Sequence, residues 1–427
     1  MDVDYLSKKL CRNARKSGKV VTKVHENKAK VKLRAMMPAA QNYAYFDHAA
    51  VGPIPRPAAE AIRRWLDQSL NHGDVFWPEW SAAASQLRQS AACLLHCNNS
   101  EIGLIPNTTF GINVVAQGYP WNARSKDNVV VLENEFSSNL LPWANLERRG
   151  VEVRKVPVAP DGVVSLDSIR QRIDGSTRIV AVSWVGYLSG YRVDLAALCD
   201  MVHGAGAQLF VDAIQGLGVF SLNTSSIPID YLAADGHKWM LGPEGAGILY
   251  IRQDNLERLE PLMLGWGSLK MAHQFQTAEM VIKQDASRYE GGSSNFAGQI
   301  GLSESLRVLL SFGCNQAVNP IAEAVLENAA CIEDRLRSIG AKLHGARSRE
   351  RRGQGADNES PNRNQISPNE LSGIVTFTLG ERDPMEIRKA LLKEQIVLSV
   401  RHGCLRVATH AYNTSEDIDR LIEGLNG

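Results

Sequence analysis

The sequence predicts an α/β protein, with a large domain built on a mostly parallel sheet and a smaller α+β domain at the C-terminus. Between residues 128 and 251, short apolar segments alternate with helical segments, which is typical of a parallel sheet covered on both faces. In the last third, a long helix is followed by short strands and two further helices. Of the 427 residues, 44% are apolar and 22% are charged, so the chain has ordinary globular composition and can bury a full core.

The elements of the large domain follow in chain order. We expect a short strand at 43–47, a turn at Gly52-Pro53 and a helix over 57–70. Further strands are predicted at 128–132, 151–156, 178–183, 208–212, 231–233 and 247–251, and further helices at 195–203 and 301–312. We assign residues 41–300 to this domain, and we expect residues 41–70 to pack with the smaller one.

The smaller domain is predicted to span residues 301–427. Strands are expected at 342–344, 373–379 and 405–408, and helices at 320–340, 384–394 and 415–424. Residues 345–370 are polar and Arg-rich with few apolar side chains, so we expect a disordered surface loop there.

The charge is distributed unevenly along the chain. Residues 1–35 hold eleven basic and three acidic side chains, whereas residues 36–427 have a net charge of −7. We expect residues 1–40 to form a basic, disordered tail; it is either a true tail or the product of a start codon upstream of Met36 and Met37. The acidic body makes nucleic acid an unlikely partner, because nucleic-acid binding requires a broad basic face.

Composition also bears on location and metals. No apolar run is long enough to span a bilayer, and the N-terminus lacks the apolar core of a secretory signal. The seven cysteines form no paired framework, which favours a reducing, cytoplasmic location. Cys93 and Cys97 lie near His96 but lack a second pair of ligands, so we expect no metal site.

Three segments carry the candidate chemistry. Asp212 ends an apolar strand, and the carboxyl ends of parallel strands line the ligand crevice. Lys238 follows another apolar strand, and burial there would lower the pKa of its amine and suit it to act as a nucleophile. Thr108 and Thr109 precede a helix, whose N-terminus can bind an anion. Each signal has a plainer alternative: a turn aspartate, a solvated lysine or an ordinary N-cap.

Together these groups are the ones that pyridoxal phosphate (PLP) requires. The anion site would hold the phosphate, the lysine the aldehyde, and the carboxylate the protonated ring nitrogen. Two other glycine-rich stretches, at 203–207 and 216–218, lack the strand–turn–helix context of a dinucleotide site, which disfavours a nucleotide-binding oxidoreductase.

The order and spacing of these motifs resemble the class V aminotransferase family, which includes cysteine desulfurases, selenocysteine lyases and isopenicillin N epimerase-like proteins. The resemblance runs from about Tyr43 to the C-terminus and is most specific at Asp212-Ala-Ile-Gln215 and Gly236-His237-Lys238. It implies a fold-type-I PLP-dependent transferase fold. It further implies that Lys238 binds the cofactor covalently, that Asp212 contacts the ring nitrogen, that Gln215 contacts the ring oxygen, and that His237 lies beside the phosphate or the lysine. Thr108 and Thr109 match the phosphate-binding pair.

Further segments extend the resemblance. Phe136 occupies the place of the residue that stacks on the cofactor ring. Ser293, in Arg288-Tyr-Glu-Gly-Gly-Ser293, matches the residue that reaches the phosphate of the partner subunit, which implies a homodimer. Arg406 matches the arginine that binds the substrate carboxylate, for which its planar fork is suited.

The sequence also departs from the desulfurase pattern. Arg401-His402-Gly403-Cys404-Leu405-Arg406 leaves no room for the long loop that carries the nucleophilic cysteine of desulfurases, so Cys404 is either a packing residue or a persulfide carrier. Tyr187 is expected to contact the ring oxygen, to line the substrate pocket or to pack in the core. His48 is a candidate for substrate contact, as is His410.

The sequence therefore predicts a PLP-dependent enzyme acting on a small amino acid substrate, with Lys238 as the catalytic base at Cα. The outcome would be epimerisation, β-substituent loss or transamination, with the isopenicillin N epimerase-like and lyase branches favoured. The alternatives are a cysteine desulfurase or selenocysteine lyase and, from another class, a non-catalytic PLP-fold binding module.

Overall fold

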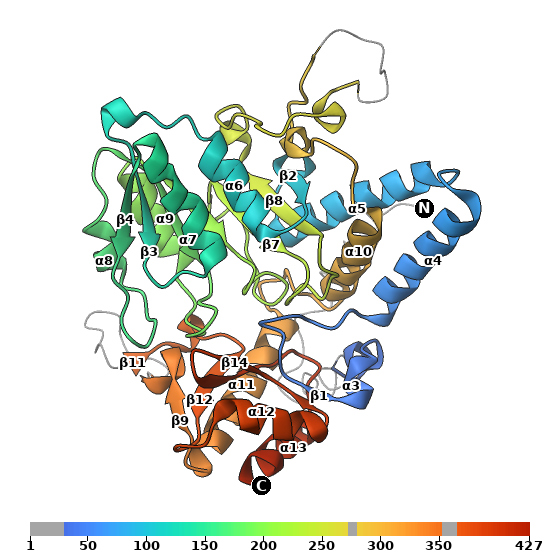
Figure 1. Ribbon diagram of the computed structural model, residues 1–427, viewed down its shortest axis with the longest axis vertical. Coiled ribbons are helices and arrows are strands. Elements are labelled where there is room, and N and C mark those ends of the chain that lie inside the picture. Colours follow the sequence, from blue (N-terminus) through green and yellow to red (C-terminus); the bar gives the residue numbers. More distant parts are fainter. Residues whose placement is uncertain (1–29, 272–279, 352–364) are drawn as a thin grey trace, which may run out of the picture.

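The computed structural model describes residues 30–271, 280–351 and 365–427. Figure 1 shows a large domain with a central sheet above a smaller domain that contains the C-terminus. Within the described part of the chain, no helix is both long and apolar enough to cross a membrane.

The large domain is built on a seven-stranded sheet with the strand order β2-β8-β7-β6-β5-β3-β4. Only β8 runs antiparallel to its neighbours, so the expected mostly parallel sheet is confirmed. The strands are β2 (Ile102–Ile105), β3 (Asn128–Leu132), β4 (Glu152–Val156), β5 (Thr177–Ser183), β6 (Gln208–Asp212), β7 (Tyr231–Asp235) and β8 (Gly247–Ile251).

Alternate residues of the central strands enter two different apolar clusters. Val130 and Val180 belong to one cluster, and Val129 and Ile179 to the other. Because successive side chains of a strand point to opposite faces, this alternation means that both faces of the sheet are covered. The covering helices include α6 (Thr108–Gly118), α7 (Ser137–Ala144), α8 (Leu166–Arg170) and α9 (Leu195–Gly204).

A further helical layer consists of α4 (Arg56–His72), α5 (Trp77–Leu95) and α10 (Phe296–Ser311), with α10 packed on both of the others. Leu302 and Leu306 of α10 are fully buried and belong to the same apolar cluster as the sheet. The predicted domain boundary at residue 301 is therefore displaced, because α10 belongs to the large domain. Residues 41–70 also divide between the domains, since α4 packs on α10.

The smaller domain is α+β, with a four-stranded antiparallel sheet in the order β14-β15-β12-β9. Its strands are β9 (Lys342–His344), β12 (Ile374–Thr378), β14 (Ser399–Arg401) and β15 (Cys404–Ala408), and its helices are α11 (Pro320–Ser338), α12 (Pro384–Lys393) and α13 (Ser415–Asn426). The short strand β1 (Ala44–Tyr45) pairs in parallel with β13 (Ile396–Val397), so the chain touches this domain before it enters the large one.

The start of the described chain differs from the expected disordered tail over 1–40. Residues 30–35 are helical, and α3 (Ala39–Asn42) follows. Leu33 and Met37 are buried in the core, and Arg34 forms a 2.7 Å ion pair with Asp417 of α13. Two apolar anchors and a paired arginine hold this segment despite its basic composition. Residues 1–29 lie outside the described residues.

The expectation of a disordered loop over 345–370 does not hold for its described residues, 345–351 and 365–370. Arg347 is 3% exposed and forms a 2.7 Å ion pair with Glu333 of α11. The two-residue strands β10 (Glu350–Arg351) and β11 (Gln365–Ile366) then pair with each other. Arg347 and Arg349 of this segment serve as ion-pair partners of Glu333 and Asp161, which composition does not reveal. Residues 352–364 lie outside the described residues.

Candidate active site

The candidate site is a cavity of about 370 Å³ at the carboxyl ends of β5, β6 and β7. This is the edge at which open α/β sheets bind ligands. The small domain contributes Arg406 from β15, so both domains form the cavity. Among its lining residues are nine of the predicted ones, namely Thr108, Thr109, Phe136, Tyr187, Asp212, Gln215, His237, Lys238 and Arg406.

Lys238 and Asp212 are the buried charged pair of this cavity. Burial lowers the pKa of Lys238 to about 8, and the nearby Asp212 carboxylate opposes that shift. Burial also raises the pKa of Asp212 to about 6, opposed by the backbone N–H of Ile214 and by Lys238. A lysine whose pKa lies this low has a neutral, nucleophilic fraction near neutral pH, and the carboxylate can pair with a buried cation.

The N-terminus of α6 forms the polar end of the cavity. Asn107 caps the helix by accepting a 2.9 Å hydrogen bond from the N–H of Phe110. The Thr108 hydroxyl accepts from the N–H of Asp235, and the Thr109 hydroxyl donates to Ser138, both at 2.8 Å. His237 lies next to them, with Nδ1 3.0 Å from a carboxylate oxygen of Asp235. Hydroxyls at a helix N-terminus suit an anion such as phosphate.

Arg406 is held by the backbone while part of its guanidinium remains unpaired. Its Nη1 donates to the backbone oxygen of Tyr187 at 2.7 Å, and its Nε donates to Ser399 at 3.2 Å. Its Nη2 lies 3.6 Å from Asp47 and is buried without a hydrogen-bond partner. An unsatisfied buried N–H is costly, and a substrate carboxylate in the cavity would satisfy this one.

Three further predicted residues line the cavity with defined contacts. Gln215 donates to the backbone oxygen of Ala49 at 3.0 Å and accepts from the indole N–H of Trp239 at 2.7 Å. Phe136 is 46% exposed, and its ring centroid lies 5.8 Å from the Lys238 amine. Tyr187 contacts Phe136 edge-on, and its hydroxyl is hydrogen-bonded to His402 at 2.8 Å. Of the three roles expected for Tyr187, its position matches pocket lining.

His48 does not line the cavity, which corrects the expectation of direct substrate contact. It is fully buried and hydrogen-bonded through its two ring nitrogens to the backbone oxygen of Ala408 and the hydroxyl of Tyr412. Burial, together with the neighbouring His410, lowers its pKa well below the usual value. His410 is likewise fully buried, stacked on Trp239. Both histidines lie next to the cavity lining, since His48 precedes Ala49 and His410 stacks on Trp239, the residue after Lys238.

Ser293 lies outside the Lys238 cavity in this chain. It lines a separate cavity of about 480 Å³, together with Gly245, Met263 and Asn295.

Sequence reasoning missed the partnership of Glu135 with Ser183. Glu135 accepts a 2.6 Å hydrogen bond from the N–H of Ser183 and contacts the hydroxyl of the same residue. Burial raises the pKa of Glu135 to about 7, opposed by these hydrogen bonds. The available signal was a carboxylate closely following an apolar strand, the same signal that identified Asp212.

Comparison with known proteins gives the family. The model of the aminotransferase class V family matches residues 44–421.

The chain belongs to the class V aminotransferase family.

Relatives of known or assigned activity agree with this. A probable cysteine desulfurase from Methanothermobacter thermautotrophicus is 29% identical over 415 residues, which cover 92% of this chain and 96% of that protein. The crystal structure of a cysteine desulfurase from Escherichia coli has a TM-score of 0.77 at 25% identity and covers 93% of this chain and 97% of that one. The structure of a cystine C–S lyase in complex with cysteine persulfide has a TM-score of 0.79 at 22% identity, covering 91% and 98%.

This class V enzyme uses PLP, and the cavity fits that cofactor. The cavity holds a buried lysine with a lowered pKa, a strand-end carboxylate and a hydroxyl-bearing helix N-terminus, the three kinds of group that the aldehyde, the ring nitrogen and the phosphate require. The prediction of a PLP-dependent enzyme is therefore confirmed. Among the described residues, no cluster of three or more histidine, cysteine or acidic side chains could hold a metal ion.

Proposed function

We propose that this enzyme removes the Cα proton of a sulfur-containing amino acid and expels the sulfur substituent from Cβ, acting as a carbon–sulfur lyase. The observation that carries the proposal is the convergence of Lys238, Asp212 and Arg406 on one cavity whose described lining residues include no cysteine. The relatives named above, which are cysteine desulfurases, support a sulfur-containing substrate.

Arg406, Lys238 and Asp212 have different roles in this reaction. Arg406 binds the substrate carboxylate through Nη2, which has no other hydrogen-bond partner, and so positions Cα in the cavity. Lys238 accepts the Cα proton, because its lowered pKa makes a neutral amine available near neutral pH. Asp212 stabilises positive charge at the inner end of the cavity. Bound PLP supplies the electron sink that stabilises negative charge at Cα.

The bond changes balance without a protein thiol. The proton leaves Cα for Lys238, and the electron pair of the Cβ–S bond leaves with the sulfur, which takes up a proton. Addition of water to the released enamine then gives a 2-oxo acid and ammonia. From L-cysteine the products are pyruvate, ammonia and hydrogen sulfide.

Cysteine desulfurase activity is the second candidate, since the relatives above carry that name. It requires a thiolate that reaches the substrate sulfur. Cys404 directly follows a tight turn at His402 and Gly403, both with positive φ angles, and it lines a neighbouring cavity instead of the Lys238 cavity. Burial raises the pKa of the Cys404 thiol, which lowers its thiolate fraction. These observations favour the lyase.

Product analysis tests the proposal. The holoenzyme is incubated with L-cysteine and L-cystine in deuterated buffer, and pyruvate, alanine, ammonia and Cα deuteration are measured. The lyase yields pyruvate and ammonia in equal amounts, and Lys238→Ala yields neither. Alanine with a persulfide that disappears in Cys404→Ser would establish the desulfurase instead, whereas Cα deuteration without a 2-oxo acid would establish an epimerase.

We further propose that the enzyme is a cytoplasmic homodimer in which Ser293 reaches the partner's cofactor phosphate. The separate cavity at Ser293 and the exposed apolar side chains of Met263, Leu264 and Trp266 nearby support an interface on this face. Light scattering of the purified protein should give twice the chain mass, and a monomer with full activity would contradict the arrangement.

A further inference from the structure

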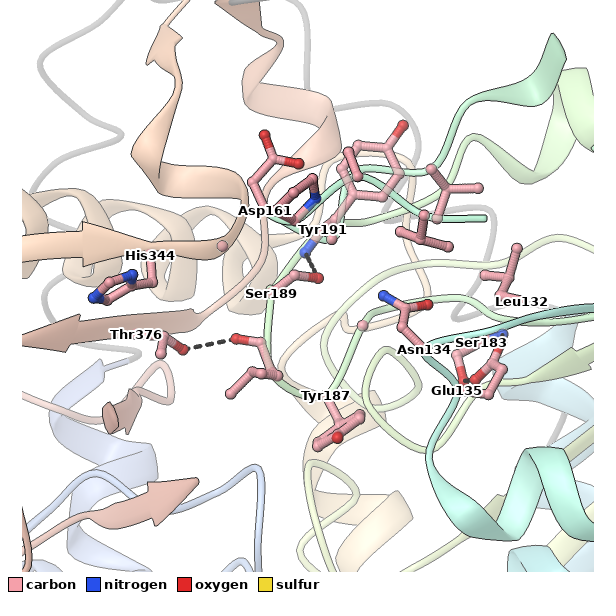
Figure 2. A pocket seen from close by; sticks show the side chains of 18 of the residues that line it. Leu132, Asn134, Glu135, Asp161, Ser183, Tyr187, Ser189, Tyr191, His344 and Thr376 are labelled. Carbon is pink, nitrogen blue, oxygen red and sulfur yellow. Dashed lines mark hydrogen bonds between the residues drawn. The ribbon is translucent and has the colours of Figure 1, made fainter. Parts of the chain in front are cut away.

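A second cavity of about 560 Å³ adjoins the catalytic one. Ser183 and Tyr187 line both, so the two are separated by these residues and not by a full layer of structure. Figure 2 shows Glu135 and Ser183 on one side of this second cavity, and Ser189 and Thr376 on the opposite side. Its volume is in the range of cavities that hold small organic ligands, about 300–1,000 Å³.

The position of Arg406 connects this cavity to the substrate. Arg406 donates to the backbone oxygen of Tyr187, so a carboxylate bound to Arg406 lies beside the segment that divides the two cavities. Because Ser183 and Tyr187 line both cavities, a long β-substituent of a substrate held there would extend toward the second cavity. The β-substituent of L-cysteine is a single sulfur atom, which cannot reach the second cavity. The second cavity would therefore have no role in the turnover of L-cysteine.

The lining of the second cavity is acidic. It includes the carboxyl groups of Glu133, Glu135 and Asp161, and none of the described residues lining it is a lysine or an arginine. Glu135 is partly protonated at pH 7, because burial raises its pKa to about 7. Asp161 is already paired with Arg349, at 2.6 and 3.2 Å. Glu133 is exposed to solvent, and among the described residues its carboxylate accepts one hydrogen bond, from the N–H of Val158 at 2.9 Å, which does not neutralise its charge.

Two histidines also line the cavity, His344 and His402, and His402 is hydrogen-bonded to the Tyr187 hydroxyl at 2.8 Å. Burial, together with the nearby Lys342, lowers the pKa of His344, so its imidazole is neutral at pH 7. The exposed carboxylate of Glu133 attracts a cation and disfavours another anion, although water screens it more than it would a buried charge. Apolar side chains, among them Leu132, Val158 and Leu188, offer contact to a hydrocarbon linker.

From this geometry we infer that the enzyme takes an S-substituted cysteine whose substituent is an extended chain with a cationic end, and that the second cavity binds this substituent with Glu133 facing the cation. The inference rests on the proposed lyase function, and it names the substrate class of that same site.

The test compares two cysteines that carry four-carbon substituents with terminal groups of opposite charge, with L-cysteine as the unsubstituted reference. The holoenzyme is assayed with S-aminobutyl-L-cysteine, S-carboxypropyl-L-cysteine and L-cysteine. We expect kcat/KM for the aminobutyl substrate to exceed that for the carboxypropyl substrate by roughly tenfold, equivalent to about 1.4 kcal/mol, with most of the difference in KM. Equal values, or a preference for the carboxypropyl substrate, would overturn the inference.

A matched pair of variants locates the effect. Glu133→Gln keeps the acceptor for the Val158 N–H but removes the charge, so the preference for the amine should fall several-fold. Glu147→Gln changes an exposed glutamate that lines neither cavity and should leave the preference intact. An undiminished preference in Glu133→Gln would also refute the assignment.

Binding measurements separate this inference from the proposed function. The α-methyl derivatives of the two substituted cysteines lack a Cα proton and cannot react by deprotonation, and their dissociation constants are measured from the change in the absorbance of the holoenzyme. Tighter binding of the amine supports the second cavity whatever the reaction proves to be. If L-cysteine and its S-substituted derivatives are bound but no sulfur is released, the lyase proposal fails alone; if sulfur is released without discrimination in binding, the cavity inference fails alone.

Discussion

Replacing Arg406 by lysine tests how the substrate is held. The guanidinium of Arg406 bonds Tyr187 and Ser399 and keeps a further nitrogen, Nη2, without a hydrogen-bond partner, which a single ammonium group cannot reproduce. Lysine is preferred to alanine for this test because Asp47, whose Oδ1 lies 3.6 Å from Nη2, retains a nearby cation. A hydrogen bond between charged groups contributes about 1.5–3 kcal/mol. Loss of about 2–3 kcal/mol lowers kcat/KM by roughly 30- to 150-fold.

The assay is steady-state release of pyruvate from L-cysteine. The loss should appear mainly as a higher KM, because the carboxylate is bound in both the ground state and the transition state. Cysteamine, which lacks the carboxylate, should react equally slowly with both proteins. Arg124→Lys, at an exposed arginine remote from the cavity, serves as the control and should behave like the wild type. An unchanged KM in Arg406→Lys, or an equal loss with cysteamine, would refute the carboxylate role.

Three further predictions concern stability and cofactor binding. Burial raises the pKa of Glu135 from 4.5 to about 7, so between these pH values the folded state binds a proton that the unfolded state has lost. The contribution of the protonated Glu135 to the free energy of unfolding is therefore fully present below pH 4.5 and is lost as the pH rises to 7. Urea unfolding should therefore show wild type losing stability relative to Glu135→Gln over this range, and parallel pH profiles would contradict it. Leu33→Ala should lower the free energy of unfolding by about 2–5 kcal/mol, because Leu33 is buried. Val31→Ala, at a 62% exposed position, should change it by less than about 0.5 kcal/mol. Equal effects of the two substitutions would contradict the packing of this segment. Gly52→Ala places a Cβ 2.1 Å from the backbone oxygen of Lys238 and should reduce PLP occupancy, measured by absorbance. In the control Gly175→Ala the new Cβ meets no atom within 4 Å, and occupancy should not change. Full occupancy in Gly52→Ala would contradict the prediction.

The predicted strands agree with the structure wherever the local pattern carried the signal. The strands at 128–132, 208–212 and 247–251 have the expected bounds, because each is a short apolar run between breakers. Lys238 and Asp212 were found for the same reason, since each polar residue lies at or shortly after the end of such a run. The strand β2 was missed, because its four residues, three apolar and one glycine, are too short a signal to distinguish from a buried turn or helix.

His48 shows why other roles could not be predicted. The sequence around His48 does not determine whether its ring faces the cavity or the core. Its orientation is fixed by Ala408 and Tyr412, which lie at the other end of the sequence. The ordered start of the chain has the same cause, since Leu33 and Met37 are apolar anchors only in the presence of the fold they pack against.

The sequence by itself determined the α/β class, the family and the cofactor, because these depend on motifs of residues close together in the chain. Only the tertiary structure decided where the domains divide, which histidines stay behind the cavity, and that a second, acidic cavity adjoins the catalytic one. Those features arise from contacts between segments far apart in sequence, and their burial and electrostatics are properties of the packed molecule.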